Sequence, residues 1–461
     1  MKKRLFAMLM VVVLIASVFV GCGGTNEAAE TKAPSEGSGT ESAGEVSEKE
    51  WSGTLKVQLI GGWELEDKTD PMSGKKTKGL QAVKEEFERL YPGATLEFYV
   101  MGWDSYQQKT QAMLNANEVD VYQVPGIASL ADQGLLEPLA PYIEKDNFDL
   151  NVYVDGQIDG WRAMGPEDDS LEIYGLPFLG DTRVICYDKV LFDQWGVEYL
   201  SLNPTVEEIK EKAEKMTGTN PVTGEMNYGI MFRGKDAADT LVNIAEGFGG
   251  TWGEGFRFNE LKFNFNSKEF VDAANWFLDI KELAPKGILT DQGVEAWWTP
   301  ENNIAINMRV IPSQMLGSFA LEGMQERIGV SMLYTNPELG MGGMFAGSPI
   351  AIGKSSEQKD LAWEYLKFVS SDFFQKHIHE NNNEFPVIKG AAEWESFKSI
   401  PQKQVLLDSM AKLWTPRYPY RAGQPRYILS ENVDLMMLGD LSVEEALNKA
   451  QTEAEAWVQE Q

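Results

Sequence analysis

The sequence predicts an α/β protein of two domains, and three observations support this. The chain has 461 residues, more than one hydrophobic core usually serves. Hydrophobic residues make up 43% and charged residues 24%, which are the proportions of an ordinary folded protein. Segments with the two-residue period of strands alternate with segments with the helical period. We therefore expect strand and helix units in both halves of the chain.

The first of these units begins at residue 54. Residues 54–60 place apolar side chains on one face, as a strand does, and residues 80–90 place Leu, Val, Phe and Leu at helical spacing. Pro92 and Gly93 end this helix, and residues 95–100 are rich in the residue types that favour strands.

A second helix is expected to begin at Asp104 or Ser105, and a short strand is expected over residues 120–124. A strand, helix, strand, helix, strand succession of this kind predicts a parallel sheet covered by helices.

Two helix starts are marked in the later part of the chain. Thr205 precedes Glu208 by three residues, and Ser442 precedes Glu445 by three residues. This is the spacing of a capping box, in which the two side chains satisfy each other's backbone N–H groups. The second half is therefore also predicted to be α/β.

The N-terminus has the features of an export signal. Basic residues 2–4 precede an apolar run over residues 5–20, and Gly21 stands before Cys22. This order resembles the bacterial lipoprotein signal, with Phe19 where Leu is usual. We predict a signal peptide over residues 1–21 and a lipid anchor at Cys22 on the outer face of the cell membrane. The alternatives are a secretory signal with an incidental cysteine and an uncleaved membrane anchor.

Residues 22–50 are predicted to be a disordered tether, because residues 23–50 contain one proline and no aromatic residue. The net charge of -29 disfavours contact with nucleic acid or with an anionic lipid surface. The second cysteine, Cys186, lies in an apolar run and is expected to be a buried thiol without a disulfide partner.

Two tryptophans stand directly after predicted strands. Gly61 and Gly62 precede Trp63, and Gly102 precedes Trp103. In open parallel sheets, ligands bind outside the carboxyl ends of the strands. Two indole rings at this edge could form a floor on which a sugar ring stacks. The alternative is that either ring simply caps the core.

Several segments resemble, in order, the extracellular solute-binding protein family 1, the sugar-binding receptors of bacterial ABC importers that include maltose-binding protein. They are residues 87–100 (FERLYPGATLEFYV), 120–121, 133–143 (QGLLEPLAPYI), 174–177 (YGLP), 184–189 (VICYDK), 204–217 (PTVEEIKEKAEKMT), 303–309 (NIAINMR) and 346–366. Asp188 stands where the family more often has Asn, and Val206 where it often has Trp.

The resemblance implies the class II type of the two-lobe periplasmic-binding-protein-like fold, with a ligand cleft between lobes joined by hinge strands. It implies an N-terminal lobe of residues 51–182 plus about 346–395, and a C-terminal lobe of residues 183–345 plus about 396–461. The chain would cross between lobes near residues 181–183, 342–348 and 390–400.

The function implied by the resemblance is that of a substrate-binding lipoprotein. Such a protein captures a carbohydrate, here expected to be an oligosaccharide, by lobe closure and delivers it to the transmembrane subunits of an ABC permease. We expect a monomer that performs no catalysis and needs no cofactor.

The family pattern also implies candidate ligand-binding residues at the loops that border the cleft. They are Trp63, Glu64, Trp103, Gln123, Asp181, Trp252, Arg309, Trp414 and Tyr418. Asp181 could accept two sugar hydroxyls or could cap a helix or stabilise the hinge. Arg309 could donate to ring oxygens or pair with a nearby acid. At most one of the adjacent Trp297 and Trp298 is expected to point inward.

The sequence argues against a metal site. His377 and His379 are the only histidines, and side chains two residues apart on a helix point apart, which disfavours chelation together with Glu380. The acidic residues 146–155 lack the spacing of a calcium loop.

Three rival functions remain open. Seventy acidic residues make carboxylate pairs available to a secreted glycoside hydrolase, although no G-x-S-x-G, zinc or phosphate-loop motif is present. A structural or adhesion lipoprotein would bind no small ligand. A receptor for a polyamine would use acids beside aromatic rings.

Overall fold

The structure, a computed structural model, describes residues 46–47, 49–69, 76–124, 126–334, 346–411 and 424–460. The chain divides into residues 1–42 and residues 43–461, and all described residues belong to the second part. The predictions for the signal peptide, Cys22, most of the tether, Trp414 and Tyr418 fall outside the described residues. Within the described ranges, no helix combines the length and the apolar character that a membrane span requires.

The first sheet has five strands in the order β4 (Ala94–Met101), β1 (Gly53–Ile60), β5 (Val121–Gln123), β16 (Ala346–Ile352) and β8 (Leu176–Asp181). Strand β1 pairs in parallel with β4 and β5, as the sequence predicts. Strand β16 is antiparallel to both of its neighbours, so the sheet is mixed, and only the part formed by β4, β1 and β5 has the predicted parallel pairing. Because β16 comes from a distant part of the chain, no local pattern fixes its direction.

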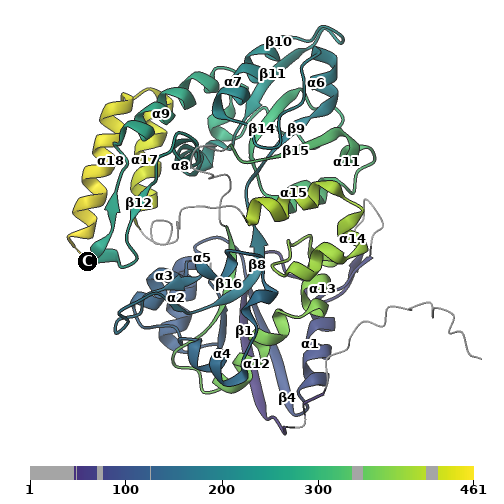
Figure 1. Ribbon diagram of the computed structural model, residues 1–461, viewed down its shortest axis with the longest axis vertical. Helices are drawn as coiled ribbons and strands as arrows, with labels where there is room; N and C mark the ends of the chain where they lie inside the picture. The colour runs from purple at the N-terminus through teal and green to yellow at the C-terminus, as the bar shows by residue number, and fades with distance from the viewer. Residues whose placement is uncertain are drawn as a thin grey trace, which may run out of the picture. The chain divides into compact units, whose positions relative to one another are not determined.

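The helices of the first lobe follow the predicted positions. Helix α1 (Leu80–Leu90) buries the four apolar residues that mark its helical period. Helix α2 (Tyr106–Ala116) has Ser105 as its N-cap. Helices α12 (Lys359–Val369) and α13 (Asp372–Asn382) return to this lobe late in the chain, next to α1 and β16 (Figure 1). The first lobe is thus built from two distant parts of the sequence.

The second sheet has the order β10 (Gly218–Thr219), β11 (Met226–Met231), β14 (Ile304–Val310), β9 (Val184–Asp188) and β15 (Ile328–Met332). Strands β11 and β14 are parallel, whereas β9 is antiparallel to both β14 and β15. Strand β8 ends at Asp181 and β9 begins at Val184, so the chain passes from the first sheet to the second through Thr182 and Arg183.

The second lobe is largely helical around this sheet. Its longer helices are α7 (Val206–Lys215), α8 (Ala237–Gly247), α9 (Lys268–Lys281), α15 (Pro401–Met410), α17 (Gln424–Leu438) and α18 (Val443–Val458). The shorter α-helices of the described ranges are α3 (Ile127–Asp132), α4 (Ala140–Asp146), α5 (Gln157–Gly160), α6 (Lys189–Trp195), α10 (Pro312–Ser318), α11 (Met324–Arg327) and α14 (Glu395–Lys398). Three small hairpins pair β2 (Lys68–Thr69) with β3 (Lys76–Thr77), β6 (Arg162–Ala163) with β7 (Glu172–Ile173), and β12 (Gly253–Glu254) with β13 (Lys262–Phe263).

The two predicted capping boxes differ. At α18, the Ser442 hydroxyl accepts from the Glu445 N–H at 3.3 Å and the Glu445 carboxylate accepts from the Ser442 N–H at 3.0 Å. At α7, Thr205 accepts from the Glu208 N–H at 3.2 Å, but the Glu208 carboxylate binds the backbone N–H and hydroxyl of Ser201 instead. Only half of that box forms, because Ser201 offers Glu208 two donors at once.

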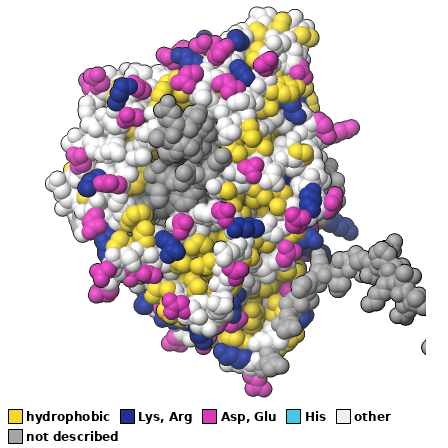
Figure 2. Space-filling view, viewed as in Figure 1, with side chains coloured by type: hydrophobic (Ala, Val, Ile, Leu, Met, Phe, Trp, Pro, Cys, Tyr) yellow, Lys and Arg dark blue, Asp and Glu magenta, His cyan; other side chains and the backbone are white. Residues whose placement is uncertain are grey.

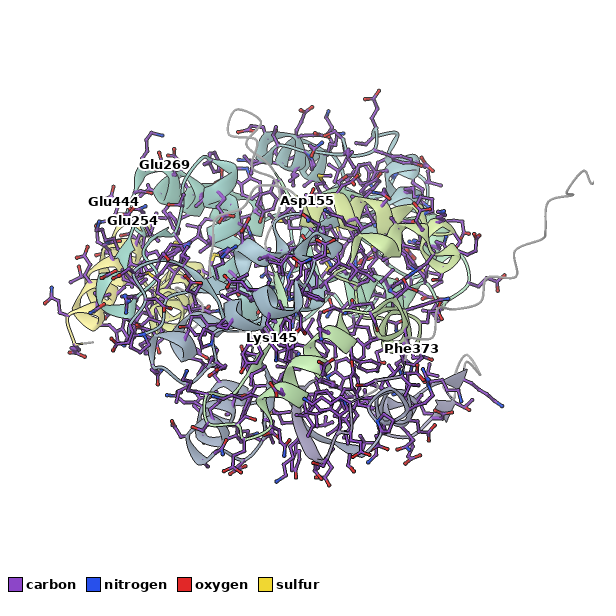
Figure 3. The ribbon with its side chains drawn as sticks, turned by 60° about the horizontal axis from the view of Figure 1, so that its bottom comes forward. Lys145, Asp155, Glu254, Glu269, Phe373 and Glu444 are labelled. Atoms are coloured by element: carbon purple, nitrogen blue, oxygen red, sulfur yellow. The ribbon has the colours of Figure 1, made fainter. Side chains whose placement is uncertain are left out.

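Most charged side chains lie at the surface, although a few, such as Asp188 and Arg309, are buried. On the face drawn in Figure 2, acidic side chains are interspersed with basic ones and no continuous basic patch is visible. Glu254 and Glu444 extend outward from the rim of the second lobe (Figure 3). In the core, β9 buries Cys186 completely, and burial raises the pKa of its thiol. This cysteine is therefore inert packing, as predicted.

Candidate functional site

The carboxyl ends of β1 and β4 bring the two predicted tryptophans together. A Cβ atom built on Gly61 would lie 3.5 Å from Trp103 Nε1 and 3.6 Å from Trp63 Nε1, so both indoles border one glycine. Gly61 has a φ of +128°, which other residues rarely adopt. The glycine thus permits the turn that brings the two indoles to one place.

The two tryptophans nevertheless have different surroundings. Trp63 is only 7% exposed, its Nε1–H donates to the Ile60 carbonyl at 3.0 Å, and its ring packs on Phe178. Trp63 therefore packs against the core, at a position where we had predicted a ligand contact. Trp103 is 52% exposed and contacts the edge of Tyr106, with ring centroids 5.3 Å apart. Trp103 therefore offers an aromatic surface to a ligand.

Glu64 and Gln123 were also predicted to bind ligand. Glu64 is exposed and pairs with Lys68 at 3.4 Å. Gln123 is fully buried, accepts from the Ile60 N–H at 2.8 Å and donates to the Ser348 hydroxyl at 3.2 Å. Its amide joins β5 to β1 and β16, and this structural role takes the place of the predicted ligand contact.

A small cavity of about 50 Å³ lies between α2, the carboxyl end of β5 and α3. The residues that line it are Tyr106, Gln107, Thr110, Gln111, Val124, Gly126, Ser129 and Leu130. Tyr106 contacts Trp103, so the cavity lies next to the exposed indole. This is the edge of the sheet at which open α/β proteins bind ligands.

The hinge holds a pair of carboxyl groups. Asp181 accepts from the Thr182 N–H at 2.8 Å and forms an ion pair with Arg183. Burial, with the negative charge of Asp181 as a second cause, raises the pKa of Glu384 to about 7. Glu384 is adjacent in sequence to Phe385, whose carbonyl accepts from the Gly180 N–H at 2.7 Å. Asp181 thus has the hinge-stabilising contacts that were the alternative to a sugar clamp.

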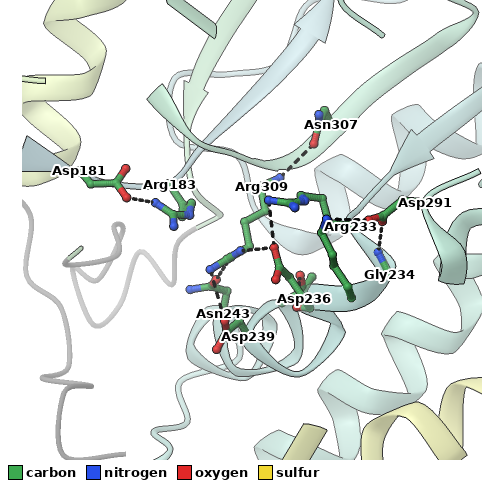
Figure 4. A network of polar contacts seen from close by, with 12 residues as sticks. Asp181, Arg183, Arg233, Gly234, Asp236, Asp239, Asn243, Asp291, Asn307 and Arg309 are labelled. Atoms are coloured by element: carbon green, nitrogen blue, oxygen red, sulfur yellow. Dashed lines mark hydrogen bonds and ion pairs between the residues drawn. The ribbon is translucent and has the colours of Figure 1, made fainter. Parts of the chain in front are cut away.

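A polar cluster lies where β14 ends beside α8 (Figure 4). Arg309 is 4% exposed, and its Nε–H donates to Asn243 Oδ1 at 3.1 Å. Its two terminal nitrogens lie 3.7 Å from Asp236 Oδ2 and 3.9 Å from Asp239 Oδ2. Arg233 pairs with Asp236 at 3.3 Å. The sequence left two roles open for Arg309, donation to sugar ring oxygens or pairing with a nearby acid. The structure shows the pairing with acids.

Helix α17 connects this cluster to the first lobe. Arg426 binds both oxygens of Asp239, at 3.3 Å and 2.8 Å. The neighbouring Tyr427 donates its hydroxyl to Gln107 Oε1 on α2 at 3.1 Å. Two consecutive residues of α17 thus contact the second-lobe cluster and the wall of the first-lobe cavity.

A second contact between the lobes lies in the loop before residues 258–260. Arg257 donates to the Asp168 carbonyl at 2.7 Å and lies 3.4 Å from the Asp132 carboxylate. The Phe258 N–H donates to the other Asp132 oxygen at 3.4 Å. The Asp168 side chain is itself fixed by the Tyr174 hydroxyl at 2.7 Å. We name Arg257, Asp132 and Asp168 the interlobe clasp.

Trp252, a further predicted ligand residue, lies in the core. It is 1% exposed and its ring centroid lies 6.2 Å from that of Phe263, so packing replaces the predicted ligand contact. Trp297 is also 1% exposed, while Trp298 is partly exposed, so one of this pair points inward.

The two histidines do not form a metal site, and no cluster of potential metal ligands occurs in the part of the chain that the structure describes. His379 donates from Nδ1 to the Glu384 carbonyl at 2.8 Å and accepts at Nε2 from Lys403 at 2.7 Å. Burial lowers the pKa of His377. His379 therefore has a structural role beside the hinge.

Sequence reasoning missed Asn243, Glu384, Arg426 and Tyr427. Asn243 lies in a helix that is buried almost all round, so no amphipathic pattern marks it. Arg426 and Tyr427 follow Pro425 near the start of α17, and a proline at a helix start followed by Arg and Tyr could have drawn attention to this end. Glu384 has no local signal, because its environment comes from β8.

The structure has two α/β lobes, hinge strands between their sheets, and an aromatic and polar site at strand ends. These features define a protein that binds a small ligand between lobes. The model of the family "Bacterial extracellular solute-binding protein" matches residues 73–375. The chain belongs to this family.

Individual known proteins are also similar to this chain over most of its length. The mannitol-binding protein of Pseudomonas aeruginosa is 22% identical over 370 residues, covering 74% of this chain and 77% of that protein. The sugar-binding protein MalE of Xanthomonas citri has a TM-score of 0.72 at 18% identity, covering 88% of this chain and 98% of that one. A ribitol complex of an ABC transporter solute-binding protein from Agrobacterium radiobacter has a TM-score of 0.68 at 20% identity, covering 88% and 100%. The two structures support the two-lobe fold.

Proposed function

We propose that this protein is the substrate-binding lipoprotein of a bacterial ABC importer, and that it captures a neutral sugar or polyol between its lobes. The observation that carries the proposal is the half-exposed Trp103 beside a polar-lined cavity at the ends of β4 and β5. Carbohydrates bind through C–H groups that pack on an aromatic face and hydroxyls that need polar partners. The names of the relatives, which include mannitol and ribitol, support this class of ligand.

The length of the carbohydrate is a separate matter. Our prediction of an oligosaccharide has no support from the two polyols named for the relatives, so the proposal covers sugars and polyols alike. The lobes in the proposal are residues 51–182 with about 346–395, and residues 183–345 with about 396–461.

Ligand capture would be coupled to lobe closure. Tyr427 and the interlobe clasp provide contacts that join the two lobes. A ligand that touches both lobes shifts the equilibrium towards the closed state by its differential affinity. We propose that the permease transmembrane subunits recognise that state and that the protein acts as a monomer.

Anchoring through Cys22 completes the proposal. A lipid at this cysteine would hold the protein at the outer face of the cell membrane, with residues 22–50 as a tether. A Cys22→Ser variant would then appear in the culture medium or in the soluble fraction, whereas the wild type would partition into detergent. Equal partitioning of both would remove the anchor from the proposal.

The rival glycoside hydrolase would need two carboxyl groups of opposite protonation in the site. Glu384, with its raised pKa, could serve as the acid of such a pair beside Asp181. However, Arg183 is paired with the Asp181 carboxylate, and this pairing makes it a poor nucleophile. A polyamine would likewise find Asp239 and Asp236 already paired with arginines. Both observations favour a neutral ligand and no catalysis.

A thermal-shift screen of the purified protein tests the proposal. The panel contains monosaccharides, oligosaccharides, polyols, polyamines and amino acids, and a ligand that binds the folded state raises the Tm as its concentration rises. A sugar or polyol that raises the Tm and is recovered unchanged supports the proposal. A response to polyamines alone, or consumption of the sugar, would overturn it in favour of an amine receptor or an enzyme.

A further inference from the structure

One residue in the wall of the cavity beside Trp103 is bonded to the other lobe. Gln107 on α2 lines the cavity and is partly exposed, and its Oε1 accepts from the Tyr427 hydroxyl at 3.1 Å. The other end of this amide, Nε2, bonds to none of the described residues and is not buried. Gln107 therefore carries an accessible donor group beside the exposed indole.

The other polar side chains of the cavity use their donors differently. Gln111 Nε2 donates to Gln133 Oε1 at 2.6 Å, and the Ser129 hydroxyl donates to the Gly126 carbonyl at 3.3 Å. Both of these bonds lie within the first lobe. Gln107 differs because its amide oxygen is held by the second lobe while its amide nitrogen remains accessible.

The second lobe holds Tyr427 in place. Arg426 binds both oxygens of Asp239, at 3.3 Å and 2.8 Å, and its guanidinium carbon lies 5.9 Å from the centroid of the Tyr427 ring. Asp239 is 4% exposed and lies 3.9 Å from a terminal nitrogen of Arg309, within the network drawn in Figure 4. The Tyr427 hydroxyl is thus anchored to a buried part of the second lobe.

This arrangement orients the Gln107 amide. A side-chain amide is planar, so a hydrogen bond at its oxygen limits the directions in which its nitrogen can donate. A side chain that is already oriented loses less rotamer freedom when it binds a ligand. Because Gln107 and Tyr427 belong to different lobes, a movement that separates the lobes at this point breaks their bond. The donor is therefore oriented only while the lobes are joined here.

We infer that Gln107 is a ligand-binding residue whose Nε2 donates to a hydroxyl oxygen of the sugar or polyol that lies against Trp103, and that Tyr427 is the positioning residue that orients it. The inference rests on the proposed function and adds to it the residue that couples ligand contact to lobe contact. It also gives the bond between Gln107 and Tyr427 a role beyond joining the lobes.

A double-mutant cycle separates a ligand contact from a contact between lobes alone. Tyr427→Phe removes the hydroxyl that orients the amide, so it should weaken carbohydrate binding about 3-fold. Gln107→Met keeps an unbranched side chain but removes both the interlobe bond and the donor, so it should weaken binding about 10-fold. The double variant should bind like Gln107→Met, because Tyr427 acts through Gln107.

Isothermal titration calorimetry would measure these affinities. The probe is D-mannitol, ribitol, D-glucose or maltose, or, if none of these raises the Tm, the carbohydrate of the thermal-shift panel that does. Gln108→Met is the matched control, because Gln108 is exposed on the same helix and is not one of the residues that line the cavity; it should leave the affinity unchanged. If Gln107→Met lowers the Tm of the sugar-free protein, Gln107→Ala takes its place.

The outcomes distinguish this inference from the proposed function. Equal weakening by Gln107→Met and Tyr427→Phe would make Gln107 a contact between lobes only and would overturn the inference. Full affinity of Gln107→Met would overturn it as well. Either result leaves the proposed function intact, whereas failure of every sugar and polyol in the panel to bind the wild type overturns both.

Discussion

Replacing Glu384 by Gln should make the protein more stable at alkaline pH and leave it unchanged at acid pH. The carboxyl group lies at the hinge, partly buried, next to Asp181, which is paired with Arg183. Burial first and the charge of Asp181 second raise its pKa to about 7 from the usual 4.5. Gln has nearly the same shape and no charge, so the variant removes only the ionisation.

The magnitude follows from the two pKa values. Between pH 4.5 and about 7 the folded protein holds a proton that the unfolded chain has lost, so the free energy of unfolding falls as the pH rises through this window. At about 1.4 kcal/mol per pH unit, ionised Glu384 destabilises the fold by up to about 3 kcal/mol above pH 7. Solvent contact of a partly buried carboxyl reduces this figure, so a gain of about 1–3 kcal/mol is expected at pH 8.

Urea unfolding at pH 5, 6, 7 and 8 would measure this gain. The control is Glu393→Gln, because Glu393 is exposed and its pairing with Lys398 lowers its pKa, so no gain on alkalinisation is expected from it. The difference between Glu384→Gln and the wild type should be small at pH 5, should grow up to about pH 7 and should then level off. A difference that is the same at all four pH values would refute the reasoning, because a constant offset does not report ionisation.

Other predictions follow from the site. Arg257→Ala removes an interlobe contact and no ligand contact, and it should raise the dissociation rate of a bound sugar several-fold. Arg89→Ala, at an exposed position, is the control and should leave that rate unchanged. Stopped-flow fluorescence would measure both rates. Trp103→Ala should weaken sugar binding about 10-fold at unchanged Tm, while Trp63→Ala should destabilise the fold by about 3–5 kcal/mol; the reverse pattern would contradict the assignment. Ser442→Ala should cost about 1 kcal/mol in urea unfolding through loss of its cap, and no change would show that the cap is redundant.

Local patterns predicted the elements well because each depends on a face that is buried. The alternation of residues 54–60 and the helical spacing of residues 80–90 require one apolar side, and both elements form with that side in the core. The direction of β16 could not be predicted in this way, since it depends on where the chain returns from the second lobe.

The site was harder to predict because neighbours distant in sequence decide it. Trp63 and Trp103 have the same local signal, a glycine before a tryptophan at a strand end, yet Phe178 covers only the first. The acidic partners of Arg309, Asp236 and Asp239, lie at the start of α8, some seventy residues earlier. Sequence thus identified the edge of the sheet that carries the site but not which of its side chains remain accessible.

Calorimetric titration of the purified protein with the sugar or polyol that raises its Tm most, beside the Trp103→Ala variant, tests the central claim most directly. The account predicts saturable binding, weaker binding by the variant, and recovery of the carbohydrate unchanged. Absence of binding by every carbohydrate, equal affinity of the variant, or conversion of the sugar to product would contradict it.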